Sequence, residues 1–296
     1  MEIIIEKWKN GTKAPFLMFF DDGLQSHIKN AIPELLHRNL KATFYINPGA
    51  SWFNKREWSK IAKENKNIVF GNHTYSHKGA NNAYEAEYEI SMCQKFIEKF
   101  NKSPSLTSFM YPGGAPWKPS KSKSSKILSK YNLILREKTL MRAAGVHIKK
   151  SADLIAEAEK SIQTETANQI TFHGVGGDWH SIDTSPFIEL LDYLTDKRDL
   201  IWVTDHISSY KYQKLFLNTK ITKLNRTENS FSFKLISKIS DRLFLDEKLT
   251  LSFQFPEDCR KIQIFKDSKK INFRIRKNRV YFDVLPDESE IKIEKF

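Results

Sequence analysis

Three features are scarce in this 296-residue chain, and each scarcity excludes a class of protein. No window approaches the ~18 uninterrupted apolar residues that a membrane-spanning helix needs, so the sequence predicts no membrane span. Only two cysteines occur, Cys93 and Cys259, and they lie far apart. They therefore form neither a disulfide framework nor a paired metal site, and we expect free buried thiols. The N-terminal segment, MEIIIEKWKNG, lacks the apolar core and the cleavage site of a secretion signal.

The composition is that of a folded globular protein. Charged residues make up 28% and hydrophobic residues 40%, while 6 Trp, 10 Tyr and 21 Phe exclude wholesale disorder. The net charge of +13 raises the possibility of a nucleic-acid partner. The lysines are scattered among acidic residues without a long basic run, so we expect no nucleic-acid binding. An anionic polysaccharide or a cell envelope is a third partner that a basic surface could attract.

Short apolar runs alternate with amphipathic segments from about residue 14 to residue 213. Segments with helical spacing lie between most of the runs, for example at 31–40 and 83–100. This alternation predicts parallel strands joined by crossover helices, in an α/β fold. We expect an incomplete or distorted (β/α)7 barrel, with an open doubly wound sheet as the alternative. The predicted strands are 16–20, 42–47, 67–71, 107–111, 132–136, 169–173 and 200–204.

The pattern changes after about residue 214, where period-two alternation replaces helical spacing. Short alternating segments separated by turn residues predict a small all-β sandwich of about 80 residues. This region carries seven of the thirteen net positive charges and contains no histidine. The sequence therefore divides into a predicted catalytic domain at 1–213 and an accessory β domain at 214–296.

Three motifs that could carry chemistry follow predicted strands, where a β/α barrel forms its active site. Asp21 and Asp22 directly follow the first run, although a lone pair of this kind is more often a polar turn. His73 and His77 are four residues apart, a spacing that places two ligands on one face of a helical turn. His173 ends a late strand, where a single histidine is more often structural.

Taken together, the motifs predict an open metal site. One carboxylate and two imidazoles leave a coordination position free for water, as in catalytic zinc sites. The second carboxylate then serves as a general base and the later histidine as a general acid.

These motifs resemble those of the polysaccharide deacetylase family, the NodB-homology domain of carbohydrate esterases. The resemblance rests on FFDDG, HTYSH, YPGG and TFHGVGGDW, in family order, and spans roughly residues 8–213. It implies that Asp22, His73 and His77 bind one divalent metal, most often zinc, with cobalt, manganese or nickel as alternatives. It also implies that Asp21 is the catalytic base, His173 the catalytic acid, and the N–H of Gly113 an oxyanion donor.

The sequence departs from the family pattern at one position of the YPGG motif. The family commonly has an arginine two residues before the proline, where it orients the base, but this chain has Met110. Arg136 and Arg142 could replace it, although both are more typical of surface arginines. Asp205 and His206 could support His173, or they could cap a helix.

The resemblance implies an acetylated poly- or oligosaccharide as the substrate, with either N- or O-acetyl groups. Candidate residues of the substrate groove are Tyr111, Trp117, Trp179 and Arg136. Two alternatives stay open: a small-molecule C–N amidohydrolase of the same fold, and a carbohydrate-binding protein that has lost turnover. We expect a secreted, periplasmic or cell-surface location if a leader was removed, and a cytoplasmic one if Met1 is native.

Overall fold

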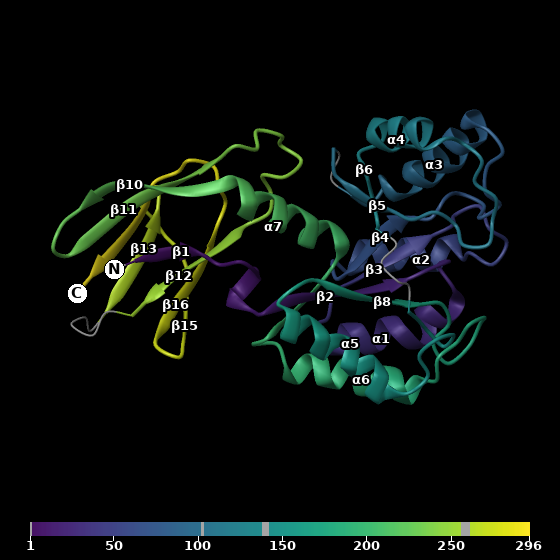
Figure 1. Cartoon of the computed structure of the whole chain (residues 1–296), viewed down its shortest axis with the longest axis horizontal. Coiled ribbons are helices and arrows are strands. Elements are labelled where there is room, and N and C mark those ends of the chain that lie inside the picture. Colours follow the sequence, from purple (N-terminus) through teal and green to yellow (C-terminus); the bar gives the residue numbers. More distant parts are fainter. Residues whose placement is uncertain (1, 102–103, 138–141, 256–260) are drawn as a thin grey trace. The chain divides into compact units, whose positions relative to one another are not determined.

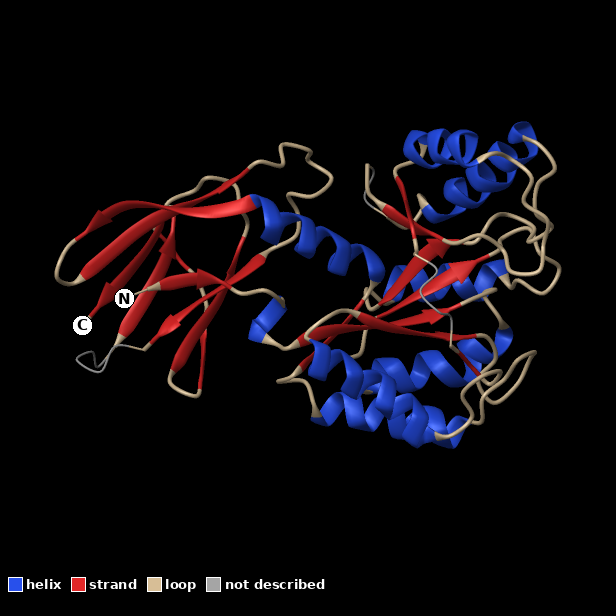
Figure 2. Ribbon diagram, in the orientation of Figure 1, coloured by secondary structure: helices blue, strands red, loops and turns tan. Residues whose placement is uncertain are grey.

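The chain forms two compact units. The computed structural model describes residues 2–101, 104–137, 142–255 and 261–296. One unit comprises residues 14–207 and is built of alternating strands and helices. The other comprises residues 1–13 and 208–296 and is built of strands together with most of helix α7 (His206–Asn218) (Figure 2).

The α/β unit contains a curled half-barrel of parallel strands, which confirms the predicted distorted barrel. Its strand order is β6-β5-β4-β3-β2-β8-β7, and β9 also pairs with β2. All seven predicted strands are present, and the two-residue β7 is additional. The strands are β2 (Ala14–Phe20), β3 (Ala42–Ile46), β4 (Ile68–Asn72), β5 (Thr107–Phe109), β6 (Leu133–Leu135), β7 (Ala143–Ala144), β8 (Asn168–Phe172) and β9 (Ile201–Thr204).

The barrel is irregular at β2, because two different strands pair with the same edge of β2. Residues 14–17 of β2 pair with β9, and residues 19–20 pair with β3 on the same edge. The opposite edge pairs with β8 along five residues. Every residue of β2 is buried, which explains its continuous apolar sequence.

Helices cover the outer face of this sheet (Figure 1). A π-helical turn at His27–Ala31 leads into α1 (Ile32–His37), where the sequence predicts one helix at 31–40. Helix α3 confirms the helix predicted at 83–100. The other helices of this unit are α2 (Lys55–Glu64), α3 (Ala83–Ile97), α4 (Lys121–Lys130), α5 (Ser151–Thr164) and α6 (Thr184–Asp196), whereas α7 belongs almost wholly to the β unit. None of the helices in the described ranges combines the length and apolar character needed to cross a membrane.

Alternate residues of the central strands serve two different cores. Phe16, Met18 and Phe20 face the large core beneath the helices, which also contains the free and buried Cys93. Phe19 belongs to a small core inside the barrel, with Leu17, Tyr45 and Met110. Cys259 lies outside the described residues. The barrel interior is therefore filled by side chains directly below the strand ends.

The β unit consists of two antiparallel sheets, in the all-β class that the alternation predicts. One sheet has the order β1-β12-β16-β15 and the other β10-β11-β17-β13-β14. Burial alternates in β17, where Ile291 and Ile293 are buried and Lys292 is exposed. The strands are β1 (Ile3–Ile5), β10 (Thr219–Arg226), β11 (Ser230–Ser237), β12 (Leu249–Gln254), β13 (Ile262–Lys266), β14 (Lys269–Lys270), β15 (Arg274–Arg276), β16 (Arg279–Val284) and β17 (Ile291–Lys295).

The first 13 residues belong to the β unit and not, as the sequence predicts, to the α/β unit. We expected 1–213 to form one domain, but Ile3–Ile5 pair antiparallel with Leu251–Phe253 of β12. The apolar segment EIIIE thus completes a sheet whose other strands lie more than 240 residues further along the chain. Pairing over that separation leaves no local signal in the sequence.

Candidate metal and catalytic site

Strand register brings the predicted motifs to one edge of the parallel sheet. The pairs at the carboxyl ends are Phe20–Phe172, Phe20–Phe44, Ile46–Asn72, Asn72–Phe109 and Phe109–Leu135. Because paired ends lie side by side, the residues that follow them form one row. In sheet order this row is Arg136, Met110, His73, Asn47, Asp21 and His173.

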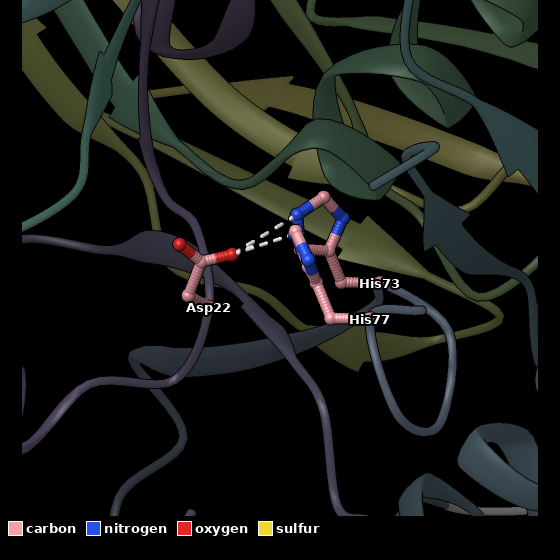
Figure 3. A group of neighbouring side chains, drawn as sticks. All are labelled: Asp22, His73 and His77. Carbon is pink, nitrogen blue, oxygen red and sulfur yellow. Dashed lines mark ion pairs between the residues drawn. The ribbon is translucent and has the colours of Figure 1, made fainter. Parts of the chain in front are cut away.

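Asp22, His73 and His77 converge as metal ligands would (Figure 3). One ligand atom from each lies within 4.8 Å of the other two. Asp22 Oδ1 is 3.4 Å from His73 Nε2 and 3.2 Å from His77 Nε2. In Figure 3 both imidazoles present a nitrogen to the same carboxylate oxygen.

The hydrogen bonding of this group fits a divalent cation. His73 Nδ1 lies 2.9 Å from the carbonyl oxygen of Met110, which can only accept, so Nδ1 carries the proton. The lone pair of Nε2 therefore points at Asp22 Oδ1, which is buried and has no hydrogen-bond partner among the described residues. Two facing lone pairs repel each other unless a cation or a proton lies between them. The three side chains thus fit a metal with carboxylate and imidazole ligands.

The charges of this group are strongly coupled. Burial alone would raise the pKa of Asp22, but the neighbouring imidazoles of His73 and His77 outweigh it and hold this pKa well below its usual range. Burial alone would lower the pKa of His73, but the Asp22 and Asp21 carboxylates outweigh it and raise this pKa. The carboxylate of Asp22 therefore stays ionised, as a metal ligand must be.

The local conformation predicted for the two histidines is wrong. They do not lie on a helical turn but on a loop, in which Thr74 and His77 adopt positive φ angles of 71° and 63°. Asn47 Nδ2 donates to the carbonyl oxygens of His73 and Thr74, at 2.5 and 3.0 Å. Glu89 of α3 accepts from the Ser76 N–H and hydroxyl, at 2.7 and 2.6 Å. Side chains from outside the motif therefore impose the geometry that brings both imidazoles to Asp22.

Asp21 meets a buried arginine. Arg136 Nη1 and Nη2 donate to Asp21 Oδ1 and Oδ2, at 3.2 and 3.3 Å. The Arg136 side chain is 1% exposed, and its guanidinium lies 4.6 Å from the ring centroids of both Phe19 and Tyr45. Burial alone would lower the pKa of Arg136, but the charge of Asp21 raises it, so the arginine stays charged. Arg136 is thus neither a surface arginine nor a wall of the groove, and that prediction is corrected.

Arg136 reaches Asp21 from the strand next to the one that Met110 follows. Met110 follows β5 and Arg136 follows β6, and the two are neighbours in the row of strand ends. Met110 is buried in the barrel core beside Phe19 and Tyr45. Arg142, the other arginine considered, is exposed and pairs with Glu157 at 2.8 Å. The contact that Met110 cannot make is therefore supplied from the neighbouring strand.

His173 lies beside Asp21 but is supported through its backbone. Its carbonyl oxygen accepts a short hydrogen bond from His27 Nε2, while His27 Nδ1 accepts from the Leu24 N–H at 3.2 Å. Its own Nδ1 is buried without a hydrogen-bond partner in the described part of the chain. Asp205, which could have supported it, instead pairs with Lys41 at 3.3 Å. His206, next to it, contacts the Ser108 hydroxyl at 2.6 Å.

His27 predicts a loss of stability in acid. Complete burial lowers its pKa from 6.5 to about 4, so the folded state holds it neutral where the unfolded chain takes up a proton. Stability is then lost as the pH falls from about 6.5 to about 4, by about 3 kcal/mol. Urea unfolding followed by tryptophan fluorescence should show wild type losing this much more than His27→Gln. Equal losses in the two proteins would contradict the assignment.

A cavity of about 380 Å³ opens over the strand ends and collects most of the predicted residues. Asp21, Asp22, His73, His77 and His173 all line it. Tyr111, Gly113 and Trp179, predicted as groove or oxyanion residues, line it as well. Trp117 is not among its lining residues, and instead packs on the cluster beneath α3 and α4 and donates to the Ser124 hydroxyl at 3.1 Å. The prediction for Trp117 as a groove residue is therefore corrected.

Three residues near the site escaped the sequence analysis. Asn47 holds the histidine loop, His27 holds the carbonyl of His173, and Trp52 donates from Nε1 to the main-chain oxygen of Asp22 at 2.9 Å. Asn47 directly follows β3, so its place at a strand end was the available signal. The sequence carries no comparable signal for His27 and Trp52, because their roles depend on contacts between loops.

Comparison with known proteins was consistent with the motifs. A family model described as polysaccharide deacetylase matches residues 9–133, a range that includes Asp21, Asp22, His73 and His77. No curated protein matches the chain significantly.

Several solved structures are similar to this chain. A CE4 esterase from Streptococcus mutans is 13% identical with a TM-score of 0.46, over 66% of this chain and 87% of its own. A peptidoglycan N-acetylglucosamine deacetylase is 20% identical with a TM-score of 0.43, over 66% of this chain and 87% of its own. A CE4 family pseudoenzyme from Bacillus anthracis is 15% identical with a TM-score of 0.43, over 67% of this chain and 65% of its own. The match at residues 9–133, which carries the FFDDG and HTYSH motifs, places this segment in the polysaccharide deacetylase family.

Proposed function

We propose that this protein is a metal-dependent hydrolase that removes acetyl groups from an N- or O-acetylated carbohydrate. The observation that carries the proposal is the convergence of Asp22, His73 and His77 beside a second, separately supported carboxylate. Both groups line one cavity together with His173. This combination matches the needs of acyl hydrolysis: a cation site, a general base and a general acid.

Asp22, His73 and His77 would hold the cation. When bound, a divalent cation polarises an acyl oxygen and lowers the pKa of a water molecule. Zinc fits a carboxylate with two imidazoles best, and cobalt, manganese or nickel suit the same donors.

The remaining steps belong to the side chains of the protein. Asp21, held by both nitrogens of the Arg136 fork, removes the proton of the attacking water. The backbone N–H of Gly113, at the wall of the cavity, donates to the oxyanion. His173 then protonates the departing amine or alkoxide, and acetate leaves with the sugar freed of its acetyl group.

The geometry bears on the two alternatives. The absence of the family arginine motivated the interpretation of the chain as a binding protein without turnover, but Arg136 supplies the same contact to Asp21. A small-molecule amidohydrolase would use the same groups on a smaller substrate. Trp179 is 39% exposed at the cavity, and such a ring offers a face for a sugar, which favours a carbohydrate.

Acetate release from a panel of substrates tests the proposal. The panel holds N-acetylated glycans, O-acetylated glycans, and small amides and ureides. Each substrate is assayed with protein whose metal has been removed by a chelator and with metal-loaded protein. We expect metal-dependent acetate release from at least one glycan and none from the chelated protein. Turnover confined to the small amides, or glycan binding without any turnover by metal-loaded protein, would contradict the proposal.

A further inference from the structure

Two half-exposed tryptophans flank Asp22 and bind it through their indole N–H groups. Trp179, in the loop after β8, is 39% exposed, and Trp52, in the loop after β3, is 37% exposed. Their rings meet edge to face with centroids 5.2 Å apart. Trp179 Nε1 donates to Asp22 Oδ2 at 2.8 Å, whereas Trp52 Nε1 donates to the Asp22 main-chain oxygen at 2.9 Å.

The two carboxylate oxygens of Asp22 therefore have different environments. Oδ2 is bound by Trp179, and Oδ1 faces the Nε2 atoms of His73 and His77. Asp22 also has a positive φ of 78°, so its backbone has left the extended conformation of β2. A donor on Oδ2 limits rotation of the carboxylate and keeps Oδ1 directed at the imidazoles. Partners of this kind commonly set how well a ligand binds its metal.

We propose that Trp179 is a positioning residue for the metal ligand Asp22, and that its indole N–H, rather than its ring face, strengthens metal binding. The inference rests on the metal site of the proposed function. The loop after β8 then has two roles, because it contains both His173 and Trp179, which donates to Asp22. Nothing in the sequence spacing connects Trp179 to Asp22, which lies 157 positions earlier.

The test compares metal affinity in the full-length protein without substrate. Trp179→Phe keeps an aromatic ring and removes the N–H, so we expect zinc and cobalt to bind about 10- to 100-fold more weakly. Competition with a chromophoric chelator measures the affinity. Trp179→Ala should weaken binding to a similar extent, because it loses the same donor. Trp52→Phe is the matched control: it removes an N–H from the main-chain oxygen of the same aspartate and should change the affinity much less.

The outcomes separate this inference from the function on which it rests. Wild-type affinity in Trp179→Phe, with or without a loss in Trp179→Ala, would overturn the role of the N–H and leave the metal site intact. Equal losses in Trp179→Phe and Trp52→Phe would also overturn it, because the effect would then not depend on the carboxylate. A wild-type protein that binds no divalent metal would overturn the metal site itself.

Discussion

Asp21→Asn should lower acetate release by about 10²- to 10⁴-fold while the protein still binds its metal, because the variant removes a general base and leaves the three ligands in place. Asp22→Asn should lose both metal and turnover, because a neutral amide replaces the charged ligand between His73 and His77. The two adjacent carboxylates thus have separable roles. Metal content and acetate release, measured on the same preparations, distinguish them.

The contrast depends on the different partners of the two residues. Asp21 contacts Arg136, and Asp22 contacts the two imidazoles and Trp179. If Asp21→Asn lost its metal as completely as Asp22→Asn, the division into base and ligand would be wrong. Full turnover by Asp21→Asn would likewise remove Asp21 from the reaction.

Arg136→Met is expected to have the second largest effect. It leaves the Asp21 carboxylate buried without its cation, which should destabilise the α/β unit by about 3–5 kcal/mol. Asp21 also loses the two guanidinium hydrogen bonds that orient it. Misplacement of a catalytic group by about 1 Å can lower the rate about 10²-fold. The loss should fall on kcat rather than KM, since Arg136 is not among the residues that line the cavity.

Two further variants keep this prediction testable even if Arg136→Met folds poorly. Arg136→Lys retains the charge but loses the bidentate contact, so it should be more stable than Arg136→Met and still slower than wild type. Arg142→Met is the matched control, because Arg142 is exposed and pairs only with Glu157 among its described salt-bridge partners. Wild-type kcat in Arg136→Lys and Arg136→Met would show that the arginine does not orient the base.

The half-barrel could be predicted from the sequence, and so could the place of the candidate site residues at strand ends, because both depend on local patterns. Buried parallel strands need continuous apolar runs, and runs such as 16–20 and 169–173 carry that signal without help from the rest of the chain. Polar residues directly after such runs must lie at the carboxyl edge of the sheet. Asp21, His73 and His173 were therefore located by their position relative to the strands, and the structure brings them to one cavity.

Features that depend on contacts between distant segments could not be predicted in the same way. The spacing of His73 and His77 suggested a helical turn, but Asn47 and Glu89 hold this segment in a loop. Arg136 resembled a surface residue because a single sequence does not reveal that Phe19 and Tyr45 enclose it. The pairing of β1 with β12 joins segments from opposite ends of the chain.

Metal stoichiometry tests the central claim most directly. Chelated protein is titrated with zinc or cobalt while bound metal and acetate release are followed together, on a glycan that the substrate panel identifies. Both signals should rise in proportion and reach a plateau at one metal per chain, and His77→Ala should show neither. Acetate release that is complete before metal is added, or that is unchanged in His77→Ala, would contradict a metal-dependent site at Asp22, His73 and His77.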